Sequence, residues 1–202
     1  MEDDLTTPAG LAKAIAAVST PSAVVMLFGA LPCTGGSQWQ YLNWFHGDAK
    51  TRAKITQHRR IFRVLWRHFV QVAEICLERG GCIAFELPRG CTYWRDRRVQ
   101  SFMQRHSLAE VRFDGCMFGL KSHATRSIGK PIRKPWTIAT PAPQLHRLRR
   151  GCTHLPHEHA PCAGSDTRLT EGYTDENVHE LHTAFREWCA AQGPQQIHVA
   201  LP

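Results

Sequence analysis

The chain contains 202 residues, of which 43% are hydrophobic, so it can bury one sizeable core and nothing in its length requires a second full domain. Lys and Arg number 25 against 17 Asp and Glu, and the formal charge of +8 favours a polyanion such as nucleic acid as the partner. The longest apolar run, 23–28, is too short for a membrane-spanning helix. We therefore expect an intracellular protein, cytoplasmic or nuclear, that has no membrane partner and whose eight scattered cysteines are free thiols.

The predicted elements alternate between helix and strand. Apolar residues recur at helical spacing between Thr6 and Pro21, and the apolar run that follows predicts a buried strand leading into a loop of small residues at 29–37. Loops at the carboxyl ends of strands are where open α/β sheets bind ligands. The later elements are expected as a helix at 48–79, a strand at 82–85, a helix around 99–103, a strand within 108–118, a surface loop at 123–134, a strand at 136–140 and a helix at 175–192. This alternation predicts an α/β fold with a mostly parallel sheet and flanking helices.

The long predicted helix at 48–79 carries many arginines outside its apolar stripe. They are Arg52, Arg59, Arg60, Arg63 and Arg67. Two interpretations remain open, because such a face can simply be solvated or can follow the phosphates of a nucleic acid.

Cys33 and Glu86 form the candidate catalytic pair. Cys33 lies in the small-residue loop directly after Pro32, and Glu86 directly follows the next predicted strand. A cytosine ring accepts a methyl group at carbon 5 only after a nucleophile adds to carbon 6 and an acid neutralises the charge at ring nitrogen 3, so a thiol and a carboxylic acid are needed together. The residues alone leave a plainer alternative open, in which Cys33 is a small buried side chain and Glu86 pairs with a nearby arginine.

Three segments, taken in order, resemble the catalytic motifs of cytosine-5 DNA methyltransferases. The loop at 29–37 resembles the family's Pro-Cys loop, 85–88 resembles its Glu-Asn-Val motif, and 116–119 with 129–139 resembles its arginine-bearing segment. The resemblance implies Cys33 as the nucleophile and Glu86 as the acid. It implies Arg133 as the best match for a contact to the base or its adduct, with Lys134 and Arg126 as competitors for that role. The further residues that it implies as substrate contacts are Pro32, Ser37, Arg126 and Lys134.

The resemblance covers about 23–140 and departs from the family in places. Leu87 stands where the family has Asn, and Ile132 stands where it has Gln. The glycine-rich turn and the acidic residue that hold S-adenosylmethionine in the family would precede the Pro-Cys strand, where only one helix is predicted. We therefore expect an incomplete Rossmann-like, class I methyltransferase-like domain at 1–145 that lacks the cofactor-binding first half. A second polypeptide can supply that half, the chain can be part of a longer reading frame, or the domain has lost catalysis.

The remainder of the chain, 146–202, is predicted to be a Cys/His-rich loop and a helix that packs on the first part. Five potential metal ligands lie within 11 residues: Cys152, His154, His157, His159 and Cys162. Thiolates and imidazoles at short spacing favour zinc. The alternatives are a polar loop rich in histidine and a catalytic or phosphate-contacting role for one of the histidines. The segment is similar to one that follows methyltransferase-like domains in polyproteins of mobile genetic elements.

Two functions follow as hypotheses. The first is transfer of a methyl group from S-adenosylmethionine to cytosine in DNA, with a partner polypeptide completing the cofactor site. The second is a non-catalytic, zinc-stabilised nucleic-acid-binding module of a mobile element, in which Trp39, Trp44 and Trp94 stack on exposed bases. In both hypotheses DNA is preferred over RNA.

Overall fold

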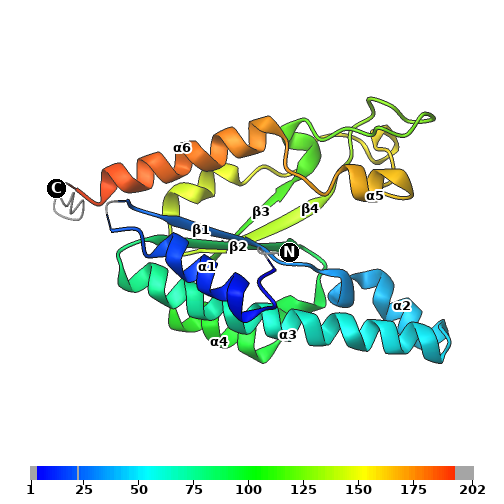
Figure 1. Ribbon diagram of the computed structural model, residues 1–202. Coiled ribbons are helices and arrows are strands. Elements are labelled where there is room, and N and C mark those ends of the chain that lie inside the picture. The colour runs from blue at the N-terminus through cyan, green and yellow to red at the C-terminus, as the bar shows by residue number, and fades with distance from the viewer. Residues whose placement is uncertain (1–3, 22, 194–202) are drawn as a thin grey trace.

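The computed structural model describes residues 4–21 and 23–193, which form an α/β fold around one four-stranded sheet (Figure 1). The α/β class expected from the sequence is therefore confirmed. The helices are α1 (Pro8–Val18), α2 (Gln38–His46), α3 (Ala49–Glu78), α4 (Arg97–Arg105), α5 (Ser165–Leu169) and α6 (Asp175–Ala191). The strands are β1 (Met26–Ala30), β2 (Cys82–Pro88), β3 (Ala109–Asp114) and β4 (Pro135–Thr140).

The sheet has the order β1-β2-β4-β3 and is mixed. β1 and β2 are parallel, with Ala30 opposite Glu86, whereas β4 runs antiparallel to both β2 and β3. The expectation of a mostly parallel sheet holds for three of the four strands, because β3 runs in the same direction as β1 and β2, and β4 alone is reversed. A parallel connection needs a crossover that returns the chain along the whole length of the sheet, usually a helix. The segment 115–134 contains only a 3₁₀ turn and loops, so the chain re-enters the sheet from the end at which it left.

Local sequence explains where the principal helices begin and end. Asp48 caps α3 by accepting a hydrogen bond from the backbone N–H of Thr51 at 2.7 Å, and Gly80, with φ of 75°, ends the helix in the left-handed conformation that glycine adopts freely. Thr174 caps α6 in the same way through the N–H of Asn177. These caps place α3 and α6 within a residue of the helices expected from the sequence.

The two faces of the sheet support separate apolar clusters. α1, α3 and α4 cover one face and α6 covers the other (Figure 1). Alternation along β2 sends Ile83, Phe85 and Leu87 toward the α3 side, while Cys82 and Ala84 face the α6 side. Glu86 continues the second set, so its carboxyl group points toward the segment that follows residue 145.

The segment after residue 145 packs closely against the sheet. Leu181 and Ala184 of α6 belong to the same buried cluster as Val111 of β3 and Ile138 of β4. Ion pairs add to this contact at the surface, where Arg147 and Arg150 both bind Glu180. Within the described residues, no helix combines the length and the apolar character needed to cross a membrane.

Candidate functional site

The loop after β1 holds Cys33 in a closely packed turn. The N–H of Gly36 donates to the carbonyl of Cys33 at 2.8 Å, which closes a 3₁₀ turn at Thr34–Gly36. A Cβ atom on Gly35 would lie 2.4 Å from the Tyr93 hydroxyl and 2.9 Å from the backbone nitrogen of Arg59, so only glycine fits there. The glycines of the Pro-Cys loop therefore let the turn pack directly on α3 and on the residues after β2.

The Cys33 thiol is half-buried at the carboxyl end of β1. Burial raises its pKa above the ordinary value, the charge of Glu86 raises it further, and the charge of Lys134 opposes both effects. The thiol is consequently protonated at neutral pH. A change that removes the negative charge of Glu86 would lower the pKa of the Cys33 thiol and so make the thiolate easier to form.

Glu86 carries a buried carboxyl group in β2, where it pairs with Ala30, the last residue of the neighbouring strand β1. Its side chain is 7% exposed, and the hydroxyl of Tyr173 donates a hydrogen bond to its Oε2 at 2.9 Å. Oε1 is buried without a hydrogen-bond partner among the described residues. Burial raises the pKa of Glu86 from 4.5 to about 7, against the opposing effects of the Tyr173 hydrogen bond and the Lys134 charge. At neutral pH this group can both hold and release a proton.

Lys134, and not Arg133, is the cation whose charge reaches this pair. Lys134 has an unusual positive φ of 28° immediately before β4, and its Nζ donates to the carbonyl oxygen of Thr170. Its charge acts on both Cys33 and Glu86. Charge effects thus link Cys33, Glu86 and Lys134, and a hydrogen bond links Glu86 to Tyr173, a residue that sequence reasoning did not assign to the site. Cys33 itself packs with the apolar cluster on the α3 side of the sheet, whereas the Glu86 side chain faces the α6 side.

The other residues predicted to contact substrate lie at different places. The Arg133 side chain is 58% exposed and its Nε lies 3.5 Å from Oδ2 of Asp114. Pro32 is exposed beside α3, lining a separate hollow, and Ser37 precedes α2 without a side-chain capping bond. Arg126 is exposed in the loop between β3 and β4. Of these residues, only Arg133 lines the groove described next.

An open groove of about 890 Å³ runs past the end of β2. Its cationic lining consists of Arg89, Arg95 and Arg133. Arg89 donates to Oδ1 of the fully buried Asp114 at 3.1 Å, and its Nε is buried without a partner among the described residues. Asp114 therefore holds Arg89 and Arg133 in place, and a groove lined by guanidinium groups suits phosphate or base oxygens.

The helix α2 borders this groove with exposed aromatic side chains. Tyr41 lines the groove and is 62% exposed, while Trp39 and Phe45 of the same helix are 73% and 63% exposed. Trp94 is instead buried, and its indole N–H donates to the carbonyl of Pro88 at 3.1 Å. Of the tryptophans considered as stacking residues, Trp39 has a free ring face, whereas the Trp44 ring is contacted by Arg59.

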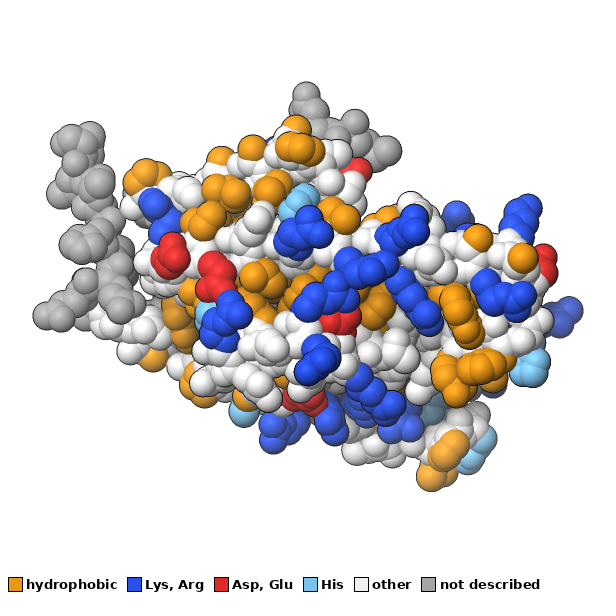
Figure 2. Space-filling model, turned by 90° about the horizontal axis from the view of Figure 1, so that it is seen from below, with side chains coloured by type: hydrophobic (Ala, Val, Ile, Leu, Met, Phe, Trp, Pro, Cys, Tyr) orange, Lys and Arg blue, Asp and Glu red, His pale blue; other side chains and the backbone are white. Residues whose placement is uncertain are grey.

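A second cationic surface covers α3 and α4. Figure 2 shows Lys and Arg side chains gathered over the helical face of the molecule, interspersed with hydrophobic groups. A shallow hollow of about 510 Å³ on this face includes Arg63, Arg67, Arg97, Arg98 and Arg105. Arg98 pairs with Asp96 and Arg105 pairs with Glu74, so acidic neighbours offset only part of this charge.

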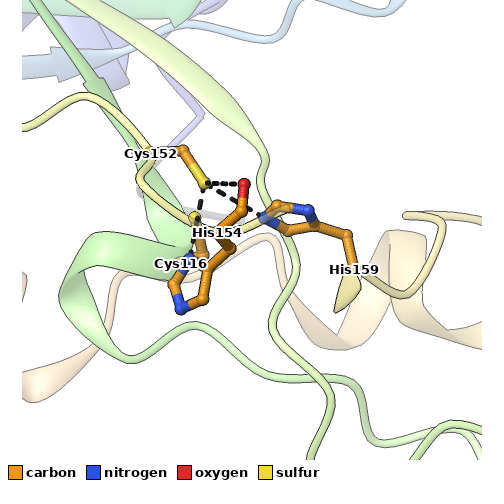
Figure 3. Close-up of side chains that lie close together, drawn as sticks. All are labelled: Cys116, Cys152, His154 and His159. Carbon is orange, nitrogen blue, oxygen red and sulfur yellow. Dashed lines mark hydrogen bonds between the residues drawn. The ribbon is translucent and has the colours of Figure 1, made fainter. Parts of the chain in front are cut away.

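Four potential metal ligands converge at the end of β3 (Figure 3). Cys116, Cys152, His154 and His159 place their ligand atoms within 4.8 Å of one another, so the cluster can hold a metal ion. Three of the five ligands expected from the sequence are in this group. His157 and Cys162 are not, and the thiol of Cys162 lies 3.6 Å from the hydroxyl of Thr170 instead. Cys116 was missed because it lies far from the others in sequence.

The residues before β1 do not fit S-adenosylmethionine as the resemblance would require. In the described part of 4–25 the chain forms the helix α1 and no strand, so no glycine-rich turn follows a preceding strand there. Gly29, within β1, packs against the ring of Phe69 and leaves no space for a ligand. The described residues thus provide no site for this cofactor of the kind found in the family.

Comparisons with models of protein families, with curated proteins and with solved structures find no match to this chain. Function must therefore be inferred from the geometry of the site itself.

Proposed function

We propose that this chain is the base-binding part of a cytosine-5 DNA methyltransferase-like enzyme in the cytoplasm or nucleus, and that a second polypeptide supplies the S-adenosylmethionine site. The observation that carries the proposal is Glu86. Its carboxyl group is buried, has one oxygen without a partner among the described residues, has a pKa of about 7, and lies near enough to Cys33 for its charge to raise the pKa of that thiol. An acid that donates a proton to a ring nitrogen at neutral pH needs these properties.

The mixed sheet is compatible with the proposed fold class. The reversed strand, β4, lies next to the edge of the sheet, and doubly wound folds often carry an antiparallel strand near an edge. In the proposed enzyme, β1 and β2 then occupy the places of the strands that lead into the Pro-Cys and glutamate motifs.

The chain's own chemistry would be reversible activation of cytosine. The sulfur of Cys33 forms a bond to carbon 6, the thiol proton leaves to solvent, and the electrons of the 5,6 double bond shift toward carbon 5 and ring nitrogen 3. Glu86 donates its proton to nitrogen 3 and so keeps the ring neutral. Once Glu86 has taken up a proton before the addition, its negative charge no longer raises the pKa of Cys33.

The groove beside the site would hold the DNA strand. Arg89, Arg95 and Arg133 supply cations for phosphates, and Tyr41 presents an exposed ring on which a neighbouring base can stack. An enzyme that acts on a base must take that base out of the helical stack, and such cationic and aromatic linings stabilise the opened strand.

Exchange of the hydrogen at carbon 5 of cytosine tests the proposal without any methyl donor. Addition of Cys33 makes carbon 5 basic, so a cytosine-containing oligonucleotide in D₂O should take up deuterium, detected by mass spectrometry. Cys33→Ala and Glu86→Gln should abolish uptake while DNA binding persists. Cys162→Ser removes an exposed thiol outside the site and serves as the matched control. Binding without exchange in the unmodified protein would rule out the catalytic proposal.

A second candidate function is a non-catalytic, zinc-stabilised nucleic-acid-binding module of a mobile element. The specific observation in its favour is the misfit to S-adenosylmethionine, together with the cationic hollow on α3 and α4, whose lining does not include Cys33. This candidate predicts DNA binding that Cys33→Ala leaves unchanged and that weakens steeply with salt. Absence of DNA binding at low salt would reject both candidates.

A further inference from the structure

We infer that Cys116, Cys152, His154 and His159 bind one structural zinc ion, which fastens the segment after residue 150 to the end of β3. Cys116 comes from the 3₁₀ turn Gly115–Phe118 that directly follows β3. The other three residues come from a stretch that lies beyond β4 in the sequence. The site thus joins two parts of the chain that are distant in sequence, which is what structural zinc sites do.

The distances in the cluster agree with the edges of a tetrahedral zinc site. The Sγ atom of Cys152 lies 3.4 Å from Nδ1 of His154 and 3.2 Å from Nε2 of His159. Bond lengths of about 2.3 Å to sulfur and about 2.0 Å to nitrogen give sulfur-to-nitrogen edges of roughly 3.5 Å in a tetrahedron. All four ligand atoms lie within 4.8 Å of one another, and Figure 3 shows the four side chains lying close together, so adjustment of the side chains would let them surround one zinc ion.

The chemistry of the donors selects the ion. Two thiols and two imidazoles are borderline-soft ligands that suit zinc, whereas magnesium and calcium prefer oxygen. All eight cysteines are free, so Cys116 and Cys152 are not joined as a disulfide despite their proximity. Four protein ligands leave no open position for water or substrate, which makes the role structural and not catalytic.

The segment that carries three of the ligands has few other means of holding its shape. Between residues 151 and 164 the regular structure is a single 3₁₀ turn, Pro156–Glu158. Its backbone anchors to the body of the protein include the N–H of Cys152, which donates to Asp114 at 2.8 Å, and the N–H of Ala160, which donates to the carbonyl of Pro131 at 2.9 Å. A zinc ion would therefore supply much of the constraint on this stretch.

The proposed zinc site is directly linked to the arginines of the groove. The backbone N–H of Cys152 donates to Oδ2 of Asp114 at 2.8 Å, and Asp114 in turn binds Arg89 and Arg133. Fixing Cys152 on the metal keeps this donor in place beneath a buried carboxylate. The ion would thus help to orient two cations of the groove through Asp114.

Metal analysis and cobalt substitution test the inference on the full chain. The purified protein should contain about one zinc per chain, and the metal-free protein titrated with Co²⁺ should show the intense visible bands of a tetrahedral site with a thiolate absorption in the near ultraviolet. Cys116→Ser and His154→Ala should lose the tight metal and these bands. The matched controls, His157→Ala and Cys162→Ser, alter ligand-type residues of the same segment and should keep both.

Each outcome is decisive. His154 is exposed, so its replacement leaves the core intact, and circular dichroism confirms that the variant is folded. Retention of the cobalt spectrum in Cys116→Ser, or its loss in His157→Ala, would overturn the ligand set. Failure of the folded unmodified chain to bind zinc or cobalt would overturn the site altogether. None of these outcomes depends on whether the protein binds DNA or acts on cytosine.

Discussion

Replacing Glu86 with Gln should stabilise the protein above neutral pH. The pKa of Glu86 lies at about 7 in the folded chain against an ordinary value of 4.5, because burial disfavours its charged form. A group whose folded-state pKa is raised favours folding fully below its unfolded pKa, and this contribution is lost as the pH rises through its folded pKa. The protein should thus lose stability between about pH 4.5 and pH 7 through this residue.

The size of the effect follows from the two pKa values. At about 1.4 kcal/mol for each pH unit between 4.5 and about 7, the deprotonated side chain costs about 3 kcal/mol. Glutamine carries no charge and can still accept the hydrogen bond from Tyr173, so Glu86→Gln should unfold like the unmodified chain near pH 4.5 and be up to about 3 kcal/mol more stable at pH 8.

Urea unfolding followed by circular dichroism from pH 4.5 to pH 8 measures this difference. Comparing the two proteins at each pH cancels the titration of histidines and other groups that they share. Glu171→Gln removes an exposed carboxylate that also acts on Cys33, and it should not reproduce the pH dependence. A difference between Glu86→Gln and the unmodified chain that stays constant with pH would refute the claim that this carboxyl group is buried and destabilised when charged.

Three further outcomes are expected. Tyr173→Phe removes the hydrogen bond that lowers the pKa of Glu86, so the pH at which cytosine exchange falls to half should move upward. A downward shift would contradict the assigned contact. Arg133→Gln should weaken DNA binding and reduce the slope of log affinity against log salt by about 0.9. The control Arg112→Gln alters an exposed arginine that pairs with Glu110, and it should leave the slope unchanged. Chelation of zinc should lower the melting temperature and weaken DNA binding together in the unmodified chain, and it should have no effect on Cys116→Ser, which already lacks the metal.

The sequence predicted the elements that depend on strong local signals. The apolar run ending at Glu86 identified β2, and helical periodicity with clear stops identified α3 and α6. The helix α2 was not foreseen, because Trp39, Leu42 and Phe45 are exposed and form no buried stripe against the core. Strand direction also could not be predicted, since it depends on how the non-helical segment 115–134 returns to the sheet.

The candidate site was predictable only in part. Cys33 and Glu86 could be selected because each follows a predicted strand, and carboxyl ends of parallel strands meet at one edge of a sheet. The choice between Arg133 and Lys134 depends on a backbone turn with positive φ at Lys134, which no local pattern indicates. Tyr173 and Cys116 reach their partners through tertiary packing alone, so a signal from neighbouring residues could not find either of them.

The way α6 packs on the sheet limits how the protein can be divided. Residue 145 lies at a natural break in the sequence pattern, yet Leu181 and Ala184 close the apolar cluster that includes Val111 and Ile138. A fragment ending at residue 145 would leave that face of the sheet open to water and would lose Tyr173 from above Glu86. Such a fragment should aggregate when it is expressed alone. Co-expression with the excised remainder should rescue its solubility, because the missing half of the core can then dock from a separate chain.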